Sequence, residues 1–529
     1  MKRIVRRAAS LALSTALVLS LAGCGHQSNT FTWQVENTPD NLDPQLAASS
    51  ENRIAVTHLY SGLFRLGPDG EVHNACAREY TVSPDGRTYT FILQEGMTYS
   101  TTKGKSTDYQ VTAEDFVFGL RRTFLPETRS PYAAELSNIE GSRAVLNGGD
   151  PDKLGVRALD EHTLEIRLSS PDDDFLRKLC LPGAMPCDEQ FFTETSGAYG
   201  LTKENTITNG SFYLYSWTGS GLFLRREPSG DLVDNLRLVL AGEDEDKDKT
   251  PPSPAQLVAD GKCHAAVADG SMDPAAEGLT RLPYTATTWT LVFNTQQAPF
   301  SSRALRAAMA QVAWDTPLTL PAGCTPADGL LPPQMGLGST SLPDLGDPAQ
   351  LFHLGLEESG LSNLTGMSIL VPEGTAQLFS PLNQEWQKQL QAFFSVKEFP
   401  LDTLRRWVDG TMPLGDIRRM EQQHGQWAVA LLPVTSVSAD PANMLRQFDD
   451  GLGGWSDSTY HAGLDAMLKM PSGAARTRSA RQLERILLEQ CPAVPLFFQS
   501  GALLVDPSVS GLVFDPFGPL LDLTFAVKK

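Results

Sequence analysis

The sequence predicts an α/β protein made of two or three domains. Segments in which apolar and polar residues alternate, typical of half-buried strands, interleave with segments whose apolar residues recur at helical spacing. They alternate without a repeat period, which favours α/β domains over a solenoid. The 529 residues are also enough to bury several hydrophobic cores.

Residues 1–23 have the layout of a secretory signal peptide. Basic residues at the start precede the mostly apolar run 8–22, which is short for a membrane span. The small residues before Cys24 resemble a bacterial lipobox, where a peptidase cuts and the thiol receives a diacylglycerol; the alternative is an ordinary cleaved signal. A polar spacer, 25–30, follows. We therefore predict an extracytoplasmic protein anchored to the cell membrane by lipid on Cys24.

The mature chain is strongly acidic. The leader holds four of the 43 Lys and Arg residues and none of the 62 Asp and Glu residues, so the mature chain has a formal charge of −23. This charge argues against a nucleic-acid partner and against docking on anionic lipid headgroups. No later stretch reaches the roughly 18 apolar residues of a spanning helix, so the lipid must hold the protein at the membrane.

Six cysteines remain once Cys24 is set aside: Cys76, Cys180, Cys187, Cys263, Cys324 and Cys491. An even number outside the cytoplasm permits disulfides, and Cys180 and Cys187 close the shortest loop. The sequence leaves two alternatives open, a Cys180–Cys187 disulfide or six reduced and buried thiols.

The N-terminal third of the chain predicts strands and tight turns. Residues 31–35 alternate as a half-buried strand, and the turn-rich sequence 36–45 follows. Pro-Asp-Gly turns within 59–72 and 80–93 sit beside alternating sequence, which indicates two hairpins.

A helix and more strands are predicted next. Thr112 begins a capping-box pattern, and the helix that follows stops at Pro126. Its apolar face consists of Phe116, Val117, Leu120 and Phe124. Residues 162–168 read as a strand and 209–228 as a hairpin, whereas the acidic stretch 242–254 is expected to be a solvated loop.

The second half of the chain opens with the strand 288–294. Ser301 or Ser302 can cap the next helix, whose Leu305, Met309 and Val312 share one face. Two amphipathic helices and two strands complete the pattern, at 380–394, 475–491, 426–432 and 493–505.

Motifs that carry enzyme chemistry are missing. No serine has glycines two residues away on both sides, and there is no phosphate-binding loop and no His-Glu-x-x-His zinc helix. The eight histidines lack ligand spacing. We therefore predict no catalytic residues, no metal site and no cofactor.

The order of several segments resembles the family 5 solute-binding proteins of ABC importers, the group that binds oligopeptides, dipeptides and nickel. The matching segments run in family order over nearly the whole mature chain. They are 42–44, 59–72, 83–100, 111–123, 209–217, 293–315, 440–448 and 492–505.

The resemblance implies a two-lobed, hinged fold of the periplasmic-binding-protein type. Lobe I would comprise residues 24–54, 206–285 and 496–529, with an extra subdomain inserted at 55–205, and lobe II residues 286–495. The resemblance also implies a monomer that encloses its solute between the lobes and presents the closed form to permease subunits in the membrane.

One segment departs from the pattern of the peptide-binding members. Their strand matching 426–441 ends in an aromatic residue, followed by an aspartate that pairs with the peptide's α-ammonium. Alignment on Asp440 and Pro441 puts Val434 and Val437 at these two positions. Asp440 could replace the aspartate, although capping the helix that begins at Pro441 is the simpler role.

The resemblance also suggests other residues for the ligand cleft. Trp407 could cover a ligand side chain or simply pack within its own lobe, and the hydroxyls near Val437 could bind a peptide backbone or make a turn. The complete set of ligand-binding candidates is Asn37, Thr38, Asn209, Trp407, Thr435, Ser436, Val437 and Asp440.

We therefore expect a lipid-anchored binding protein, without catalysis, that delivers a peptide or peptide-like solute to an ABC permease. The missing amine partner favours blocked, cyclic, modified or non-peptide ligands. Three alternatives stay open: a carrier of nickel chelates or haem, a peptide-sensing module not coupled to import, and an extracellular hydrolase.

Overall fold

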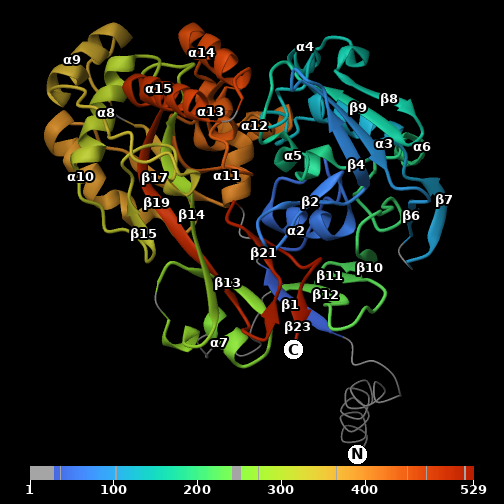
Figure 1. Ribbon diagram of the computed structural model, residues 1–529. Helices are drawn as coiled ribbons and strands as arrows, with labels where there is room; N and C mark the ends of the chain where they lie inside the picture. Colours follow the sequence, from blue (N-terminus) through green and yellow to red (C-terminus); the bar gives the residue numbers. More distant parts are fainter. Residues whose placement is uncertain are drawn as a thin grey trace, which may run out of the picture.

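The computed structural model describes residues 29–529 except 36, 102–103, 241–251, 272, 365, 450, 472 and 518–519. The predicted signal peptide and Cys24 lie outside the described residues, as does most of the acidic stretch 242–254. Figure 1 shows a lower part that carries two upper bodies side by side. We call the lower part lobe I, the body with α3 and β4–β9 the subdomain, and the body with α8–α15 lobe II.

A sheet of eleven strands, counted over the described residues, runs from lobe I into lobe II. Its order is β10-β11-β12-β1-β13-β19-β14-β18-β16-β17, with β15 paired to β19. Its strands are β1 (Thr30–Val35), β10 (Tyr213–Thr218), β11 (Gly221–Arg225), β12 (Asn235–Leu240), β13 (Ala265–Asp269), β14 (Thr280–Phe293), β15 (Cys324–Pro326), β16 (Ser368–Pro372), β17 (Ser395–Phe399), β18 (Val429–Thr435) and β19 (Ala493–Val505).

Two long strands, β14 and β19, connect the lobes. They pair antiparallel from Thr280 opposite Val505 to Val292 opposite Ala493. At one end β19 pairs with β13 of lobe I, and at the other β14 pairs with β18 of lobe II. The register shifts midway, between Tyr284 and Thr287. This pair forms the hinge (Figure 1).

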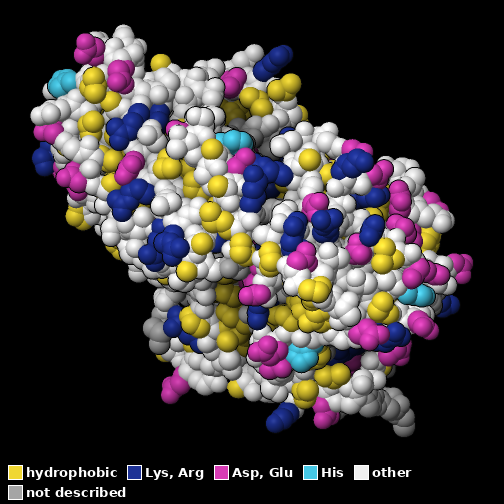
Figure 2. All heavy atoms as spheres, turned by 45° about the horizontal axis from the view of Figure 1, so that its top comes forward, with side chains coloured by type: hydrophobic (Ala, Val, Ile, Leu, Met, Phe, Trp, Pro, Cys, Tyr) yellow, Lys and Arg dark blue, Asp and Glu magenta, His cyan; other side chains and the backbone are white. Residues whose placement is uncertain are grey.

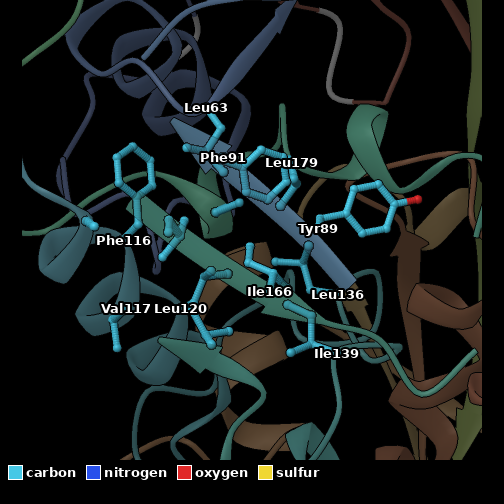
Figure 3. Close-up of a cluster of buried hydrophobic side chains, with 14 of the residues drawn as sticks. Leu63, Tyr89, Phe91, Phe116, Val117, Leu120, Leu136, Ile139, Ile166 and Leu179 are labelled. Atoms are coloured by element: carbon cyan, nitrogen blue, oxygen red, sulfur yellow. The ribbon is translucent and has the colours of Figure 1, made fainter. Parts of the chain in front are cut away.

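The subdomain surrounds a four-stranded sheet in the order β4-β5-β9-β8. Figure 3 shows side chains from β5, α3 and β9 meeting in one apolar interior. The expected helical face of Phe116, Val117, Leu120 and Phe124 is buried there, as predicted. Its elements are β2 (Phe64–Leu66), β3 (Val72–Asn74), β4 (Ala77–Val82), β5 (Thr88–Leu93), β6 (Thr98–Ser100), β7 (Ser106–Gln110), α3 (Ala113–Phe124), α4 (Ser142–Leu146), η1 (Pro151–Lys153), β8 (Val156–Asp160), β9 (Thr163–Arg167), α5 (Phe175–Lys178), η2 (Pro182–Ala184) and α6 (Glu189–Glu194), where η marks a short 3-10 helix.

Lobe II consists of helices packed around strands β16–β18. Ser302 caps α8, because its hydroxyl accepts from the Leu305 amide at 3.2 Å. The helices are α8 (Arg303–Asp315), η4 (Pro333–Met335), α9 (Pro348–Ser359), η5 (Ala376–Leu378), α10 (Phe379–Leu390), α11 (Leu401–Val408), α12 (Leu414–His424), α13 (Ala442–Asp449), η6 (Leu452–Gly454), α14 (Ser458–Leu468) and α15 (Ala474–Gln490).

Lobe I packs its remaining elements around β1, where Phe31 and Trp33 are fully buried. These elements are α2 (Ser50–Leu59), α7 (Pro254–Ala259), η3 (Pro274–Ala276), β20 (Val509–Ser510), β21 (Val513–Asp515), β22 (Leu520–Asp522) and β23 (Val527–Lys528). The residue boundaries predicted for the lobes and the subdomain stay a prediction.

The hairpins and helices expected from the sequence are confirmed. The Pro-Asp-Gly turns join β2 to β3 and β4 to β5, and 209–228 contains the hairpin β10–β11. The strand expected at 288–294 is longer, since β14 begins at Thr280, in a stretch that is half-exposed and lacks a clear apolar pattern. Within the described residues, no helix combines the length and apolar composition of a membrane span.

The alternative of a Cys180–Cys187 disulfide is wrong. All six described cysteines are free. The Cys180 thiol donates to the Leu176 carbonyl oxygen at 3.5 Å, whereas the buried Cys187 sulfur accepts from the Arg122 guanidinium at 3.5 Å. The two sulfurs therefore have different hydrogen-bond partners, and neither forms a disulfide.

The charged side chains on the face drawn in Figure 2 are interspersed rather than gathered by sign. This face therefore offers no basic patch of the kind that binds nucleic acid.

A buried ion pair ties lobe I to the subdomain. Arg122 on α3 donates to both carboxylate oxygens of Asp43, one of them at 3.1 Å, and to the Gln45 side-chain oxygen at 2.7 Å. Both charged side chains are at most 6% exposed. Asp43 belongs to the segment 42–44 that carries part of the family resemblance, so this segment has a structural role.

The substitution Asp43→Asn is expected to lower the free energy of unfolding by about 3–5 kcal/mol, because it leaves the Arg122 guanidinium buried without a carboxylate. Denaturant unfolding followed by circular dichroism measures this loss. The matched control is Asp152→Asn, since Asp152 pairs with the neighbouring Arg121 at the surface. The control should lower the free energy of unfolding by less than about 1 kcal/mol. Equal losses in the two variants would contradict the assigned role of Asp43.

Candidate functional site

The loop after β18, residues 436–441, is where lobe II meets the other two parts. The Glu135 carboxylate of the subdomain accepts hydrogen bonds from the Ser438 hydroxyl and the Asn443 side-chain amide, both through Oε1. Glu135 is only 4% exposed. Burial, with the nearby Asp440 carboxylate, raises the pKa of Glu135 to about 8, although the bond from Ser438 opposes this rise.

Arg53 on α2 of lobe I joins three segments. Its guanidinium donates to the Val437 carbonyl oxygen at 3.0 Å, to the Asp515 carboxylate at 2.6 Å and to the Phe517 carbonyl oxygen. The Arg53 side chain is 3% exposed. Burial raises the pKa of Asp515, and Arg53 opposes that shift. Phe517, close to the C-terminus, packs in the core cluster of lobe II.

The subdomain and lobe II also exchange apolar contacts. Ala134 of the subdomain packs in a core cluster of lobe II, and Val437 packs against the core of the subdomain. Ser170 donates to the Lys469 carbonyl oxygen at 3.2 Å. Arg143 forms an ion pair with Asp465. The two bodies are therefore closed against each other.

A cavity of about 280 Å³ remains between the subdomain and lobe II. It is lined by both signs of charge, and each cation has a carboxylate partner. The pairs are Lys178 with Asp172 at 2.7 Å, Arg476 with Asp440 at 2.6 Å, and Arg177 with Asp174 at 3.5 Å. Met335, Leu337 and Leu181 supply its apolar walls.

Asp440 is held by its own lobe. Its Oδ1 accepts from the Ala442 amide at 3.0 Å near the start of α13, and its Oδ2 accepts from Arg476. These bonds are of the kind expected if Asp440 caps the helix that begins at Pro441. Its role toward a ligand stays a prediction.

The structure brings some of the expected ligand residues together. Thr435 ends β18, and Ser436 and Val437 follow it in the loop at the contact between the lobes. Thr435 is exposed, and the Ser436 hydroxyl donates to the Ser438 carbonyl oxygen at 2.7 Å, which closes a turn. The half-buried Val437 side chain packs against the subdomain core.

The other candidates are held elsewhere. Asn209 binds the Ser61 backbone through both its oxygen and its nitrogen, at 3.1 and 3.0 Å. Trp407 is 2% exposed and packs within lobe II. Asn37 is exposed, and Thr38 is half-buried in the loop after β1. Whether these residues contact a ligand stays a prediction.

Glu135 and Arg53 were missed by the sequence analysis. The partners of Glu135 lie 303 and 308 residues away in the chain, and no local spacing marks such pairs. Among the described residues, no group of three or more His, Cys, Asp or Glu side chains is arranged to hold a metal ion.

Comparison with known proteins gives consistent matches. The model of the family described as "Bacterial extracellular solute-binding proteins, family 5 Middle" matches residues 71–454. The probable deoxycholate-binding periplasmic protein YgiS of Escherichia coli K12 is 25% identical, covering 91% of this chain and 90% of YgiS. The oligopeptide-binding protein OppA of Bacillus subtilis 168 is 22% identical, and the match covers 96% of this chain and 97% of OppA.

A solved structure shares the fold. OppA of Listeria monocytogenes bound to peptide aligns with a TM-score of 0.73 and 21% identity, over 95% of this chain and 100% of that one. The two-lobed architecture is therefore the one observed in that binding protein.

Replacing Arg53 by Met is expected to destabilise the protein by about 2–3 kcal/mol at neutral pH, because Asp515 loses its cation and two carbonyl groups lose their donor. Without Arg53 the pKa of Asp515 rises further. The loss relative to the wild type should therefore grow as the pH rises from about 4 to about 7, since the carboxylate of Asp515 is then charged and lacks its cation.

Thermal unfolding across this pH range measures that loss. The control Arg78→Met removes an exposed cation paired with Glu79. It should change the stability by less than about 1 kcal/mol at every pH. A loss in Arg53→Met that does not vary with pH would contradict the electrostatic role assigned to Arg53.

Proposed function

Because the chain belongs to family 5 of the bacterial extracellular solute-binding proteins, we propose that it captures a peptide or peptide-like solute between its lobes and delivers it to an ABC permease. The hinge carries this proposal. β14 and β19 join lobe I to lobe II, and the two lobes also meet through the loop after β18. A protein that traps its ligand between two lobes requires such a connection. We propose no catalytic step for this binding protein.

Peptide capture is supported by the names of relatives. OppA of Bacillus subtilis is named an oligopeptide-binding protein, and the Listeria structure contains a peptide. A peptide suits such a cleft because strand edges bind its main chain, while water-filled pockets accept different side chains.

The ligand we propose lacks a free α-ammonium group. Val437 occupies the position of the aspartate that pairs with this group in peptide-binding members, and its side chain packs against the subdomain core. Asp440, the alternative acid, is already bound to Arg476. A blocked, cyclic or modified peptide, or a non-peptide solute, fits these residues better, and YgiS carries the name of a bile-acid binder.

Ligand binding would act by shifting populations. The solute binds the closed form better because both lobes contact it there, and the closed form is then the shape that the permease recognises. A lipid on Cys24 would keep this protein close to the permease and so raise its local concentration.

Mass spectrometry of small molecules released from the purified protein identifies the solute directly. Calorimetry with paired peptides then tests its chemistry. We expect N-acetylated peptides to bind at least as tightly as the same peptides with a free N-terminus, because no carboxylate at position 437 pairs with the ammonium. A preference of more than about tenfold for the free N-terminus, roughly 1.4 kcal/mol, would contradict the proposed ligand class.

The variant Cys24→Ser is expected to leave the membrane fraction and appear in the medium or periplasm, because the acyl chains have no other site of attachment. Cell fractionation with immunoblotting measures the distribution. Cys263→Ser is the matched control, since Cys263 is a buried free thiol in the folded body, and it should stay with the membrane. Retention of Cys24→Ser at the membrane would contradict the lipid anchor.

A further inference from the structure

We propose that Glu135 couples closure of lobe II to the uptake of one proton. Its carboxyl group is the point at which the subdomain holds the loop after β18, and both of its donors, Ser438 and Asn443, belong to lobe II. This coupling goes beyond the proposed transport function, and it holds whatever solute the cleft binds.

Closure removes Glu135 from water. In the closed arrangement it is 4% exposed, and the neighbouring Ala134 packs in the core of lobe II. Opening would separate Glu135 from Ser438 and Asn443, which all lie where the two bodies touch, and water would replace these donors. The surroundings of the Glu135 carboxyl group therefore change more on opening than those of a side chain that lies inside either body.

Burial and the Asp440 carboxylate disfavour the ionised form of Glu135 and raise its pKa. The nearby cations, Lys178 on α5 and Arg476 on α15, oppose this rise. Each of these cations already has its own carboxylate, since Lys178 pairs with Asp172 and Arg476 with Asp440. The other charged groups on the walls of the cavity, Arg177 and Asp174, also pair with each other.

The hydrogen bonds are compatible with a protonated carboxyl group. Ser438 and Asn443 both donate to Oε1, so Oε2 can carry the proton while both bonds remain. The pKa of Glu135 is raised to about 8 in the closed form, whereas a solvated Glu has its ordinary value of about 4.3.

The sign of the effect follows from these two values. At a pH between these two pKa values, the closed form holds one proton more than the open form. Lowering the pH therefore favours closure, and raising it favours opening. The closure constant should change about tenfold per pH unit between about pH 5 and about pH 7. An acidic medium would therefore help the protein to retain its solute.

Small-angle X-ray scattering of the full-length protein tests this coupling. Its radius of gyration reports closure and is measured without added solute from about pH 5 to about pH 9. The wild type should become more compact as the pH falls. Glu135→Gln keeps an oxygen that accepts from Ser438 and Asn443 but takes up no proton, so its radius should not respond to pH.

A matched control separates proton coupling from loss of a contact. Ser170→Ala removes a hydroxyl that lies within hydrogen-bond distance of the Lys469 carbonyl group across the contact and of the Asn138 side-chain oxygen within the subdomain, and neither partner titrates. This variant should open more easily and keep the pH response. A pH response in Glu135→Gln equal to that of the wild type would overturn the proposal.

A second series covers the case in which Glu135→Gln does not fold. Arg143→Ala removes the ion pair with Asp465 and shifts the equilibrium toward the open form, where scattering detects closure readily. This variant should close as the pH falls. If neither it nor the wild type becomes more compact at low pH, the proposal fails.

Discussion

The whole architecture depends on the pairing of β14 with β19. These strands belong to lobe I at one end and to lobe II at the other, and their ladder is continuous apart from two shifts of register. Because every backbone group in a ladder needs its partner, the two strands bend together rather than separate. Gly501 permits their close approach near the first shift, since a β-carbon there would lie 2.3 Å from the Tyr284 hydroxyl.

The charged groups buried between the parts of the molecule fix their mutual position. Arg122 holds lobe I to the subdomain, and Arg53 holds α2 to the C-terminal segment and to the loop after β18. Burying an ion pair gains little net free energy, but leaving one charge unpaired costs several kcal/mol. Such pairs therefore favour one arrangement over its neighbours. Glu135 differs from them because, among the residues that the structure describes, Lys178 and Arg476 near it are paired with other carboxylates, so that we propose a proton neutralises it instead.

Local chemistry made much of the fold predictable. The Ser302 cap and the Pro-Asp-Gly turns act over a few residues, so their sequence patterns identify them. The order of such segments also carried the family resemblance and hence the two lobes. The contacts of Glu135 join residues about 300 positions apart, and no pattern in a single sequence encodes them. The short separation of Cys180 and Cys187 likewise does not reveal that the Cys187 sulfur is bound by Arg122, 65 residues away in the chain.

The presence of Val437, where the family resemblance predicts an aspartate, bears on what the loop after β18 can do. An aspartate there would need a cation in every closed state, and the ligand's ammonium group would be that cation. Val437 needs only apolar neighbours, which the subdomain core supplies, while its carbonyl group binds Arg53. The loop can therefore close against the rest of the protein without the charge of a ligand. Glu135 of the opposite body also lies at this contact, and under the proposed coupling a proton rather than the charge of a ligand neutralises it.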